Sequence, residues 1–268
     1  METVKNLDDI SNLKDNRIIG TPEFKNSTIQ FRGMNNILVC DGEITLRNCK
    51  ISFNGNNSII YLSYTDSDYH MSVIVRNNST IYIGKNNKMG LRLDLNIQEH
   101  QNLIIGDDCI IGNNIKIRTC DAHPIYSYDT KERVNYSQSI IIGDHVWIDH
   151  FTYISKGVKV GSGAIVGLNS FLTSSNTIHS NDYVEGNPVR LLNKNVFFTK
   201  DFMGTCTPEE TVNFSTYKSD VYKYEFVENE TLAFDKIDKI LKDLTVDDRL
   251  EFIKKLFVRN KLKNRFYI

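Results

Sequence analysis

The sequence predicts an all-β fold, a parallel β-helix, followed by a small α-helical C-terminal extension. Two observations predict it: every sixth residue from Ile142 to Val184 is aliphatic, and residues 199–268 change to the spacing of amphipathic helices. A strict period of six fits neither an α-helix nor a simple strand of period two. Three hexads, each a short strand ending at a corner, make a triangular coil of about 18 residues whose aliphatic side chains point inward.

The inward series is uninterrupted over eight hexads. The residue after each aliphatic position is mostly small or acidic, which suits a corner where the backbone needs room. A shorter copy of the repeat lies upstream. The series comprises Ile142, Ile148, Ile154, Val160, Val166, Leu172, Ile178 and Val184, with Ile105, Ile111 and Ile117 upstream.

We expect three parts along the chain. Residues 1–100 contain β-rich runs between Asn and Gly turns, interpreted as irregular coils of the same helix, with a separate β-sandwich as the alternative. Residues 101–198 form the regular β-helix acetyltransferase core, interrupted by loop 118–139. Residues 199–268 carry two helical segments, the second with Thr245 as its N-cap. This extension is interpreted as a cap or trimer-stabilising tail, with a docking arm for another enzyme as the alternative.

Composition excludes several classes of partner. The net charge of −1 gives no basic surface for nucleic acid. No apolar run approaches about 18 residues, so no membrane insertion is expected, and the polar N-terminus does not resemble a secretory signal. The five cysteines are odd in number and form no CxxC pair. Reduced thiols and a cytoplasmic location are therefore expected.

The repeat breaks between Ile117 and Ile142, and a loop that leaves a regular scaffold often carries function. The loop opens on Asp121-Ala122-His123-Pro124 and is followed by the hexad IGDHVWI, which contains Trp147. This combination resembles the sugar O-acetyltransferase branch of the hexapeptide-repeat acyltransferases, which includes galactoside, maltose, capsular polysaccharide and sialic acid O-acetyltransferases. The resemblance implies a left-handed β-helix, a homotrimer, acetyl-CoA as co-substrate and a sugar or polysaccharide acceptor.

The same resemblance implies that His123 is the general base and that Trp147 lies at the acyl-transfer site. A sugar hydroxyl is a poor nucleophile at neutral pH, and an imidazole with a pKa of about 6.5 can remove its proton during attack on a thioester. The imidazole needs a hydrogen-bond acceptor to fix its tautomer. Asp121, Asp94 and Asn96 are candidates for this orienting role or for the acceptor side of the site.

The resemblance also places acetyl-CoA along the prism between two copies of the chain. His150 matches a position that contacts the pantetheine arm, and Leu168 matches a backbone contact. Thr173 and Ser174 match a Thr-Lys pair, in which Ser174 lacks the lysine charge. Arg190 closes a Gly-x-Pro-x-Arg motif and could hold the nucleotide phosphates through charge-assisted hydrogen bonds.

Two other chemistries are weighed against this one. Cys120 is expected to face outward near a corner, and no motif supports it as a nucleophile, so acetyl transfer is expected to be direct. His123, His145 and His150 also resemble the zinc ligands of γ-class carbonic anhydrases. The two later histidines occupy a different phase of the repeat, so their rings should point in different directions, and no metal is expected.

The acceptor stays open at this level. The preferred function is O-acetylation of a hydroxyl in a capsular or surface polysaccharide or its precursor. N-acetylation of a nucleotide-linked amino sugar and a non-catalytic scaffold are the alternatives. The segment Tyr61–His70 is rich in aromatic and polar side chains, which indicates either exposed strand tyrosines or a surface that stacks on sugars.

Overall fold

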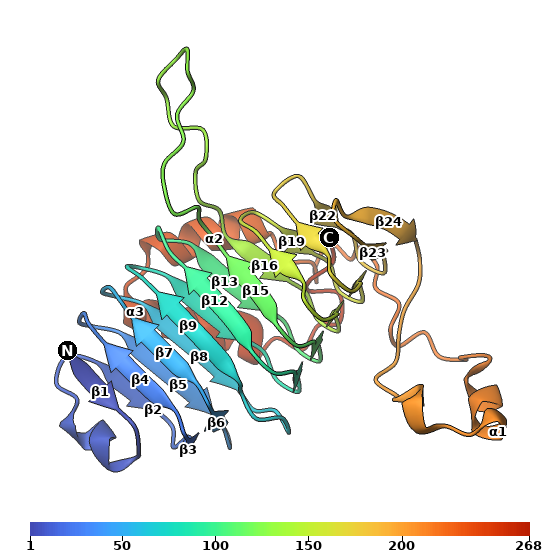
Figure 1. The fold of residues 1–268 in the computed structure, drawn as a ribbon, viewed down its shortest axis with the longest axis horizontal. Helices are drawn as coiled ribbons and strands as arrows, with labels where there is room; N and C mark the ends of the chain where they lie inside the picture. Colours follow the sequence, from blue (N-terminus) through green and yellow to red (C-terminus); the bar gives the residue numbers. More distant parts are fainter.

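The computed structural model describes residues 1–268 and shows one β-helix from the N-terminus to about residue 193 (Figure 1). Its strands lie in three long sheets, and each coil adds one strand to each sheet in turn. Coils pair in parallel, except that β1 and β24 pair antiparallel at the two ends. The predicted parallel β-helix with a C-terminal helical part is confirmed.

The three sheets form the faces of the prism. Face A contains β1 (Glu2–Val4), β4 (Thr28–Phe31), β7 (Lys50–Phe53), β9 (Met71–Val75), β12 (Leu93–Ile97), β15 (Ile115–Arg118), β18 (Tyr153–Ile154) and β21 (Phe171–Leu172). Face B contains β2 (Arg17–Ile19), β5 (Ile37–Asp41), β8 (Ile59–Ser63), β10 (Thr80–Ile83), β13 (Asn102–Ile105), β16 (Ile140–Ile142), β19 (Lys159–Val160) and β22 (Thr177–Ile178). Face C contains β11 (Lys88–Met89), β14 (Ile110–Ile111), β17 (Trp147–Ile148), β20 (Ile165–Val166), β23 (Tyr183–Glu185) and β24 (Arg190–Asn193), and β3 (Glu23–Lys25) pairs with β6 (Thr45–Arg47) in a separate two-stranded sheet.

The inward aliphatic series forms the core as predicted. All eight residues from Ile142 to Val184 are at most 4% exposed, and the three upstream isoleucines are at most 2% exposed. Trp147 pairs with Ile165, 18 residues later, so three hexads complete one coil. Apolar burial along this axis is the main favourable term that holds the coils together.

The N-terminal half belongs to the same helix, so the β-sandwich alternative is wrong. Its strands lie in faces A and B beside those of the regular core. The coils are longer but regular, because Ile51 pairs with Val73, 22 residues later, and Thr80 pairs with Asn102, also 22 residues later. The interpretation as irregular coils is therefore wrong in this respect: the period is longer, and the strands of faces A and B are too.

Asparagine occupies many corners of these longer coils. Asn35, Asn57 and Asn78 stand one coil apart with φ of 57°, 58° and 52°, a left-handed conformation that asparagine tolerates better than most residues. The Asn35 Nδ2 donates to the Asn57 Oδ1 at 2.8 Å, and Asn78 lies 3.1 Å from His100 Nδ1. Corner geometry therefore gives the abundance of asparagine in this half a structural role.

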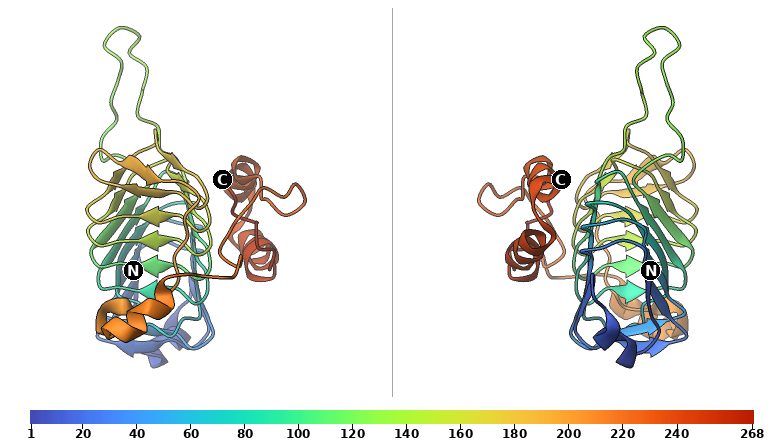
Figure 2. Two further views of the ribbon diagram at one scale, coloured as in Figure 1. Left: turned by 90° about the vertical axis from the view of Figure 1, so that its right-hand side faces the viewer. Right: turned by 90° about the vertical axis from the view of Figure 1, so that its left-hand side faces the viewer.

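The C-terminal helices cover face B (Figure 2). Helices α2 (Phe234–Asp243) and α3 (Val246–Ile253) bury one apolar side against the outward residues of this sheet, whereas α1 (Pro208–Thr211) lies apart. The predicted N-cap is confirmed, because the Thr245 hydroxyl accepts from the Asp248 amide at 3.2 Å. None of the helices is both long and apolar enough to span a membrane. The buried contact comprises Ile37, Val39, Ile59, Tyr61, Tyr82, Ile104 and Ile141 from the sheet and Phe234, Ile237, Leu241, Val246, Leu250, Ile253, Phe257 and Phe266 from the extension.

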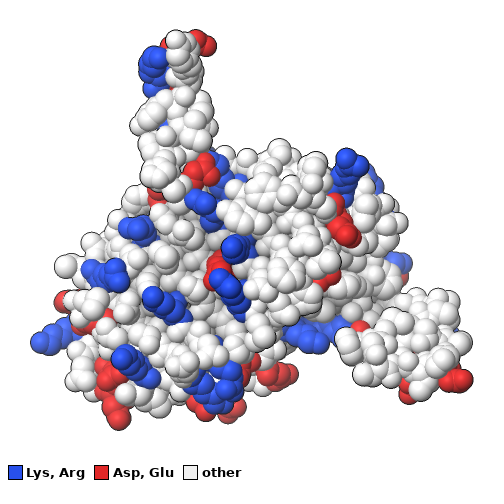
Figure 3. All heavy atoms as spheres, viewed as in Figure 1, with Lys and Arg blue, Asp and Glu red and all other residues white.

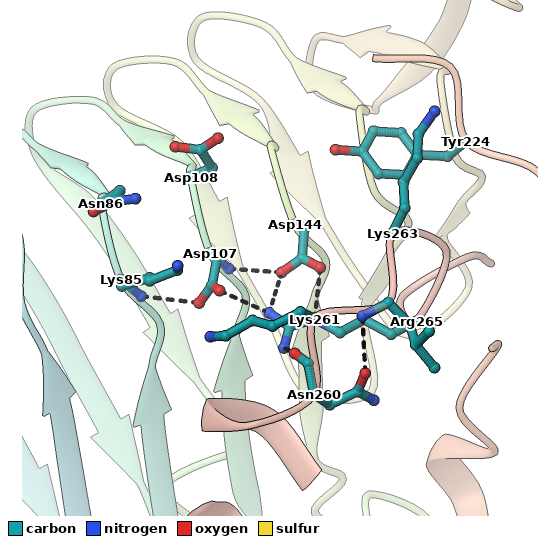
Figure 4. A pocket seen from close by; sticks show the side chains of 11 residues that line it. Lys85, Asn86, Asp107, Asp108, Asp144, Tyr224, Asn260, Lys261, Lys263 and Arg265 are labelled. Carbon is teal, nitrogen blue, oxygen red and sulfur yellow. Dashed lines mark hydrogen bonds and ion pairs between the residues drawn. The ribbon is translucent and has the colours of Figure 1, made fainter. Parts of the chain in front are cut away.

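Arg265 fixes the end of the chain to the β-helix (Figure 4). Its guanidinium is 2% exposed and binds both carboxylate oxygens of Asp144, at 2.7 and 2.8 Å, and one of Asp107, at 3.0 Å. It also donates to the carbonyls of Phe257 and Asn260. Burial alone would lower the pKa of Arg265, but the paired carboxylates raise it, so the guanidinium stays charged.

The tyrosines of Tyr61–His70 are mostly structural. Tyr61 and Tyr69 are 2% and 0% exposed, and their hydroxyls donate to Asp41 at 2.6 Å and to the Ser63 carbonyl at 2.7 Å. Both interpretations of this segment, sugar stacking and exposed strand tyrosines, are wrong for these two residues. Only Tyr64 presents a largely exposed ring.

Candidate functional site

Residues 119–139, named the finger here, project far from the β-helix between β15 and β16 (Figure 1). Because β15 lies in face A and β16 in face B, the finger leaves the prism at the corner between these faces. Its two arms pair through Val134 N to the Ile125 carbonyl at 2.9 Å and Ser127 N to the Glu132 carbonyl at 2.8 Å. On the side shown in Figure 3, charged groups of both signs are scattered over the body and gather on the finger mainly at its tip.

The base of the finger holds the backbone around His123. Buried Asn135 donates to the His123 carbonyl and to the Asp121 carboxylate, both at 2.9 Å, and accepts from the Ile125 amide at 2.7 Å. Lys156 binds the same Asp121 oxygen at 2.5 Å and, with Asn135, lowers the pKa of this carboxyl. The His123 side chain is exposed. Asp121 therefore positions the loop and makes no hydrogen bond to the imidazole.

The other two candidates for orienting His123 stand on β12. Asp94 and Asn96 point outward from face A, on alternate positions of the strand. Asp94 lies 3.5 Å from Arg92 Nε, and the Asn96 side chain accepts from Gln98. Neither side chain hydrogen-bonds to His123 within the chain.

Trp147 lies on face C, in the outward row that also contains Ile110 and Ile165. The finger corner between faces A and B is the corner opposite face C in a triangular prism. His123 and Trp147, the two residues predicted at the reaction centre, are therefore on opposite sides of a single chain.

His150 and Leu168 stand one coil apart at the corner between faces C and A. The Asn169 amide donates to the His150 carbonyl at 3.0 Å, and His150 Nδ1 accepts from the Asn113 amide at 2.6 Å. Gly112 leaves room for this ring, since a Cβ there would lie 2.9 Å from Nδ1. The structure thus brings His150 and Leu168 together beside Trp147.

Thr173 and Ser174 lie elsewhere. They follow β21 at the corner between faces A and B, the same corner from which the finger leaves. Arg190 is exposed on β24 at the end of face C. A single chain therefore carries two separated groups, one with Trp147, His150 and Leu168 and the other with the finger, Thr173 and Ser174.

A cavity of about 730 Å³ opens on face C beside Trp147. One wall is the β-helix surface of three successive coils, and the other is residues 198–204, named the arm here. The Phe198 ring centroid lies 5.8 Å from that of Trp147. Sequence reasoning missed the arm, because no motif indicated that the segment after β24 returns to cover face C.

His145 anchors the arm. Its ring is 1% exposed and stacks between Phe198, at 4.2 Å between centroids, and Tyr222, at 4.1 Å. The Phe198 carbonyl, 3.0 Å from Nε2, can only accept, so Nε2 carries the proton, and the buried Nδ1 has no partner. His145 and His150 thus make separate contacts, and no three His, Cys, Asp or Glu side chains are grouped so that they could hold a metal ion.

Acid should weaken this anchor. Burial lowers the pKa of His145, opposed by the Phe198 carbonyl and Asp108, with Lys200 adding to the lowering. Stability is therefore complete above the unfolded value of about 6.5 and is lost as the pH falls through it toward the lower folded value. Between about pH 7.5 and 5.5, the melting temperature should fall further for the native chain than for His145→Gln, which has no titrating ring. Equal falls in the two proteins would contradict this role.

Cys120 is buried, at 2% exposure, so the expectation that it faces outward is wrong. Burial raises the pKa of its thiol, which disfavours the nucleophilic thiolate. All five cysteines are free thiols. These findings agree with the expectation that transfer does not pass through a cysteine.

Sequence comparisons confirm the resemblance to hexapeptide-repeat acyltransferases. Residues 139–174 match the family described as bacterial transferase hexapeptide (six repeats). The chain is 29% identical to the polysialic acid O-acetyltransferase of Neisseria meningitidis over 52% of its length and 65% of that relative. It is 31% identical to the galactoside O-acetyltransferase of Escherichia coli strain K12 over 42% of its length and 54% of that relative. The chain therefore spans less than two thirds of either relative.

Solved structures agree on the fold. The polySia specific acetyltransferase NeuO superposes with a TM-score of 0.64 at 24% identity, covering 75% of this chain and 95% of NeuO. The polysialic acid O-acetyltransferase OatWY superposes with a TM-score of 0.56 at 21% identity, over 74% and 95%. At these identities the likeness concerns the β-helix and does not by itself assign a reaction.

Proposed function

We propose that this chain is an acetyl-CoA-dependent O-acetyltransferase that acts on a sugar hydroxyl of a surface polysaccharide or its precursor. The observation that carries the proposal is the finger base, where Asn135 and Asp121 fix the backbone around His123 and leave its imidazole exposed. A base that must reach a large acceptor needs this combination of a fixed backbone and an accessible ring. The O-acetyltransferase names of the relatives support the same chemistry.

The reacting groups come from two copies of the chain. His123 and Trp147 lie on opposite sides of one copy, so a second copy must supply the missing half of each site. Closed cyclic symmetry repeats such a contact between every pair of neighbours, as in the homotrimer expected from the sequence. The finger also carries exposed apolar side chains, among them Ile125, Tyr126 and Tyr136, which a neighbouring copy would cover.

Transfer then needs no covalent enzyme intermediate. The His123 imidazole takes the proton of the acceptor hydroxyl as its oxygen attacks the thioester carbonyl, and a tetrahedral intermediate forms. The C–S bond then breaks, and the imidazolium returns the proton to the departing CoA thiolate. His150 and Leu168, adjacent on one corner, would contact the pantetheine arm, and exposed Arg190 would reach the phosphates.

CoA release from acetyl-CoA in the presence of different acceptors tests the proposal. Sialic-acid oligomers, a β-galactoside and an amino sugar should be compared, with the product analysed for a hydroxylamine-labile ester or a stable amide. The proposal expects release that depends on a hydroxyl acceptor and yields an ester. A preference for the amine with an amide product would favour the N-acetyltransferase alternative, and no acceptor-dependent release would favour a non-catalytic scaffold.

A further inference from the structure

We propose that the arm forms the acceptor side of this site and that the 730 Å³ cavity beneath it binds one sugar ring of the glycan next to Trp147. This inference rests on the proposed function and adds the residues that choose the acceptor. The arm follows the last strand of the β-helix, and nothing in the hexads specifies it.

The position of the cavity separates acceptor from donor. In face C, β17 with Trp147 stands between β14 on one side and β20 on the other. The cavity extends from Trp147 toward β14 and β11 and includes no residue of β20. The proposed coenzyme residues Leu168 and Arg190 lie the other way, after β20 and on β24. A coenzyme on that side delivers its acetyl group at Trp147 and leaves the cavity for the acceptor.

The lining suits a carbohydrate. Trp147 and Phe202 offer aromatic faces, and Met203 adds a flexible apolar side chain. Asp149 and Asn113 at the edge supply acceptors and donors for hydroxyl groups. Apolar walls with a few polar groups at the rim recognise the two kinds of surface of a pyranose ring.

The arm is held where this role requires it. His145 clamps Phe198, and Lys200 on the arm binds Asp108 of the β-helix at 2.7 Å and the Asn86 carbonyl at 2.9 Å. Phe202, by contrast, is 70% exposed and makes its surface available to a ligand. The anchors therefore lie beside the exposed contact residue, so that residue can be replaced without removing them.

Fluorescence offers a direct readout, because Trp147 is the only tryptophan in the chain. Titrating the full-length protein with sialic-acid oligomers, and separately with a β-galactoside, should change Trp147 emission for at least one of them. Phe202→Ala should weaken that glycan by about 2- to 10-fold, the range expected for loss of one aromatic contact, and should raise its KM by a similar factor. The KM for acetyl-CoA should stay within about twofold.

Phe226→Ala is the matched control, since Phe226 is 64% exposed and lies outside the cavity. It should leave both KM values and the glycan titration unchanged. If Phe202→Ala raised the KM for acetyl-CoA instead of that for the glycan, the cavity would belong to the donor and the inference would fall. Acetyl transfer by the native chain with no effect of Phe202→Ala on either titration or KM would also overturn it, while the proposed function would stand.

Discussion

Replacing His123 with alanine should lower kcat for acetyl transfer by about 10²–10⁴-fold, the usual contribution of a general base. The loss should appear in kcat, with the KM for acetyl-CoA nearly unchanged, because the imidazole acts on the acceptor proton rather than on the coenzyme. The His123 side chain is exposed and makes no hydrogen bond, so the melting temperature should not change. Steady-state kinetics at saturating acetyl-CoA with the best acceptor measures the effect.

Two further variants make this result specific. His123→Gln keeps polarity without a titrating group and should be as slow as alanine. Tyr128→Ala, at an 87% exposed position of the same finger, should retain native turnover. Full turnover by His123→Ala would remove the general-base assignment, and an equal loss in Tyr128→Ala would point to disturbance of the finger instead.

Replacing Arg265 with alanine should destabilise the protein by about 3–5 kcal/mol, because it leaves the buried Asp144 carboxylate without its partner. It also removes donors from the carbonyls of Phe257 and Asn260. The end of the chain and the helices on face B should loosen together. Urea unfolding followed by circular dichroism measures the change in the free energy of unfolding.

Arg259→Ala provides the control, since Arg259 is exposed and makes no ion pair; it should change stability by at most about 0.5 kcal/mol. Adding Asp144→Asn to Arg265→Ala should recover part of the loss, since no charge is then left buried and unpaired. Native stability in Arg265→Ala would show that this contact does not hold the extension.

The regular coils could be predicted because their signal is local. One inward aliphatic residue in every six, as at Ile148 and Ile154, gives both the coil length and the direction of each side chain. The finger was visible as a break in that period. The corner on which each predicted site residue lies follows from the same hexads, once the order of the three faces is known.

The remaining features depend on contacts between distant residues. The 22-residue coils lack a hexad because their strands on faces A and B are longer, so their period is hidden unless one strand is aligned with the next. Arg265 binds Asp144, 121 residues earlier, and Phe198 meets His145, 53 residues earlier. Nothing near either residue in the sequence marks its partner, so the arm and its cavity could be found only in three dimensions.

Mixing two inactive variants tests most directly whether the site is shared between copies. His123→Ala and Trp147→Ala chains should each lose most activity alone, and each should keep the native oligomeric state. Co-expressed chains that assemble at random should regain about one quarter of native activity, because one neighbour contact in four then joins an intact His123 to an intact Trp147. Mixed oligomers that remain as inactive as either variant alone would contradict a site built from His123 of one copy and Trp147 of the next.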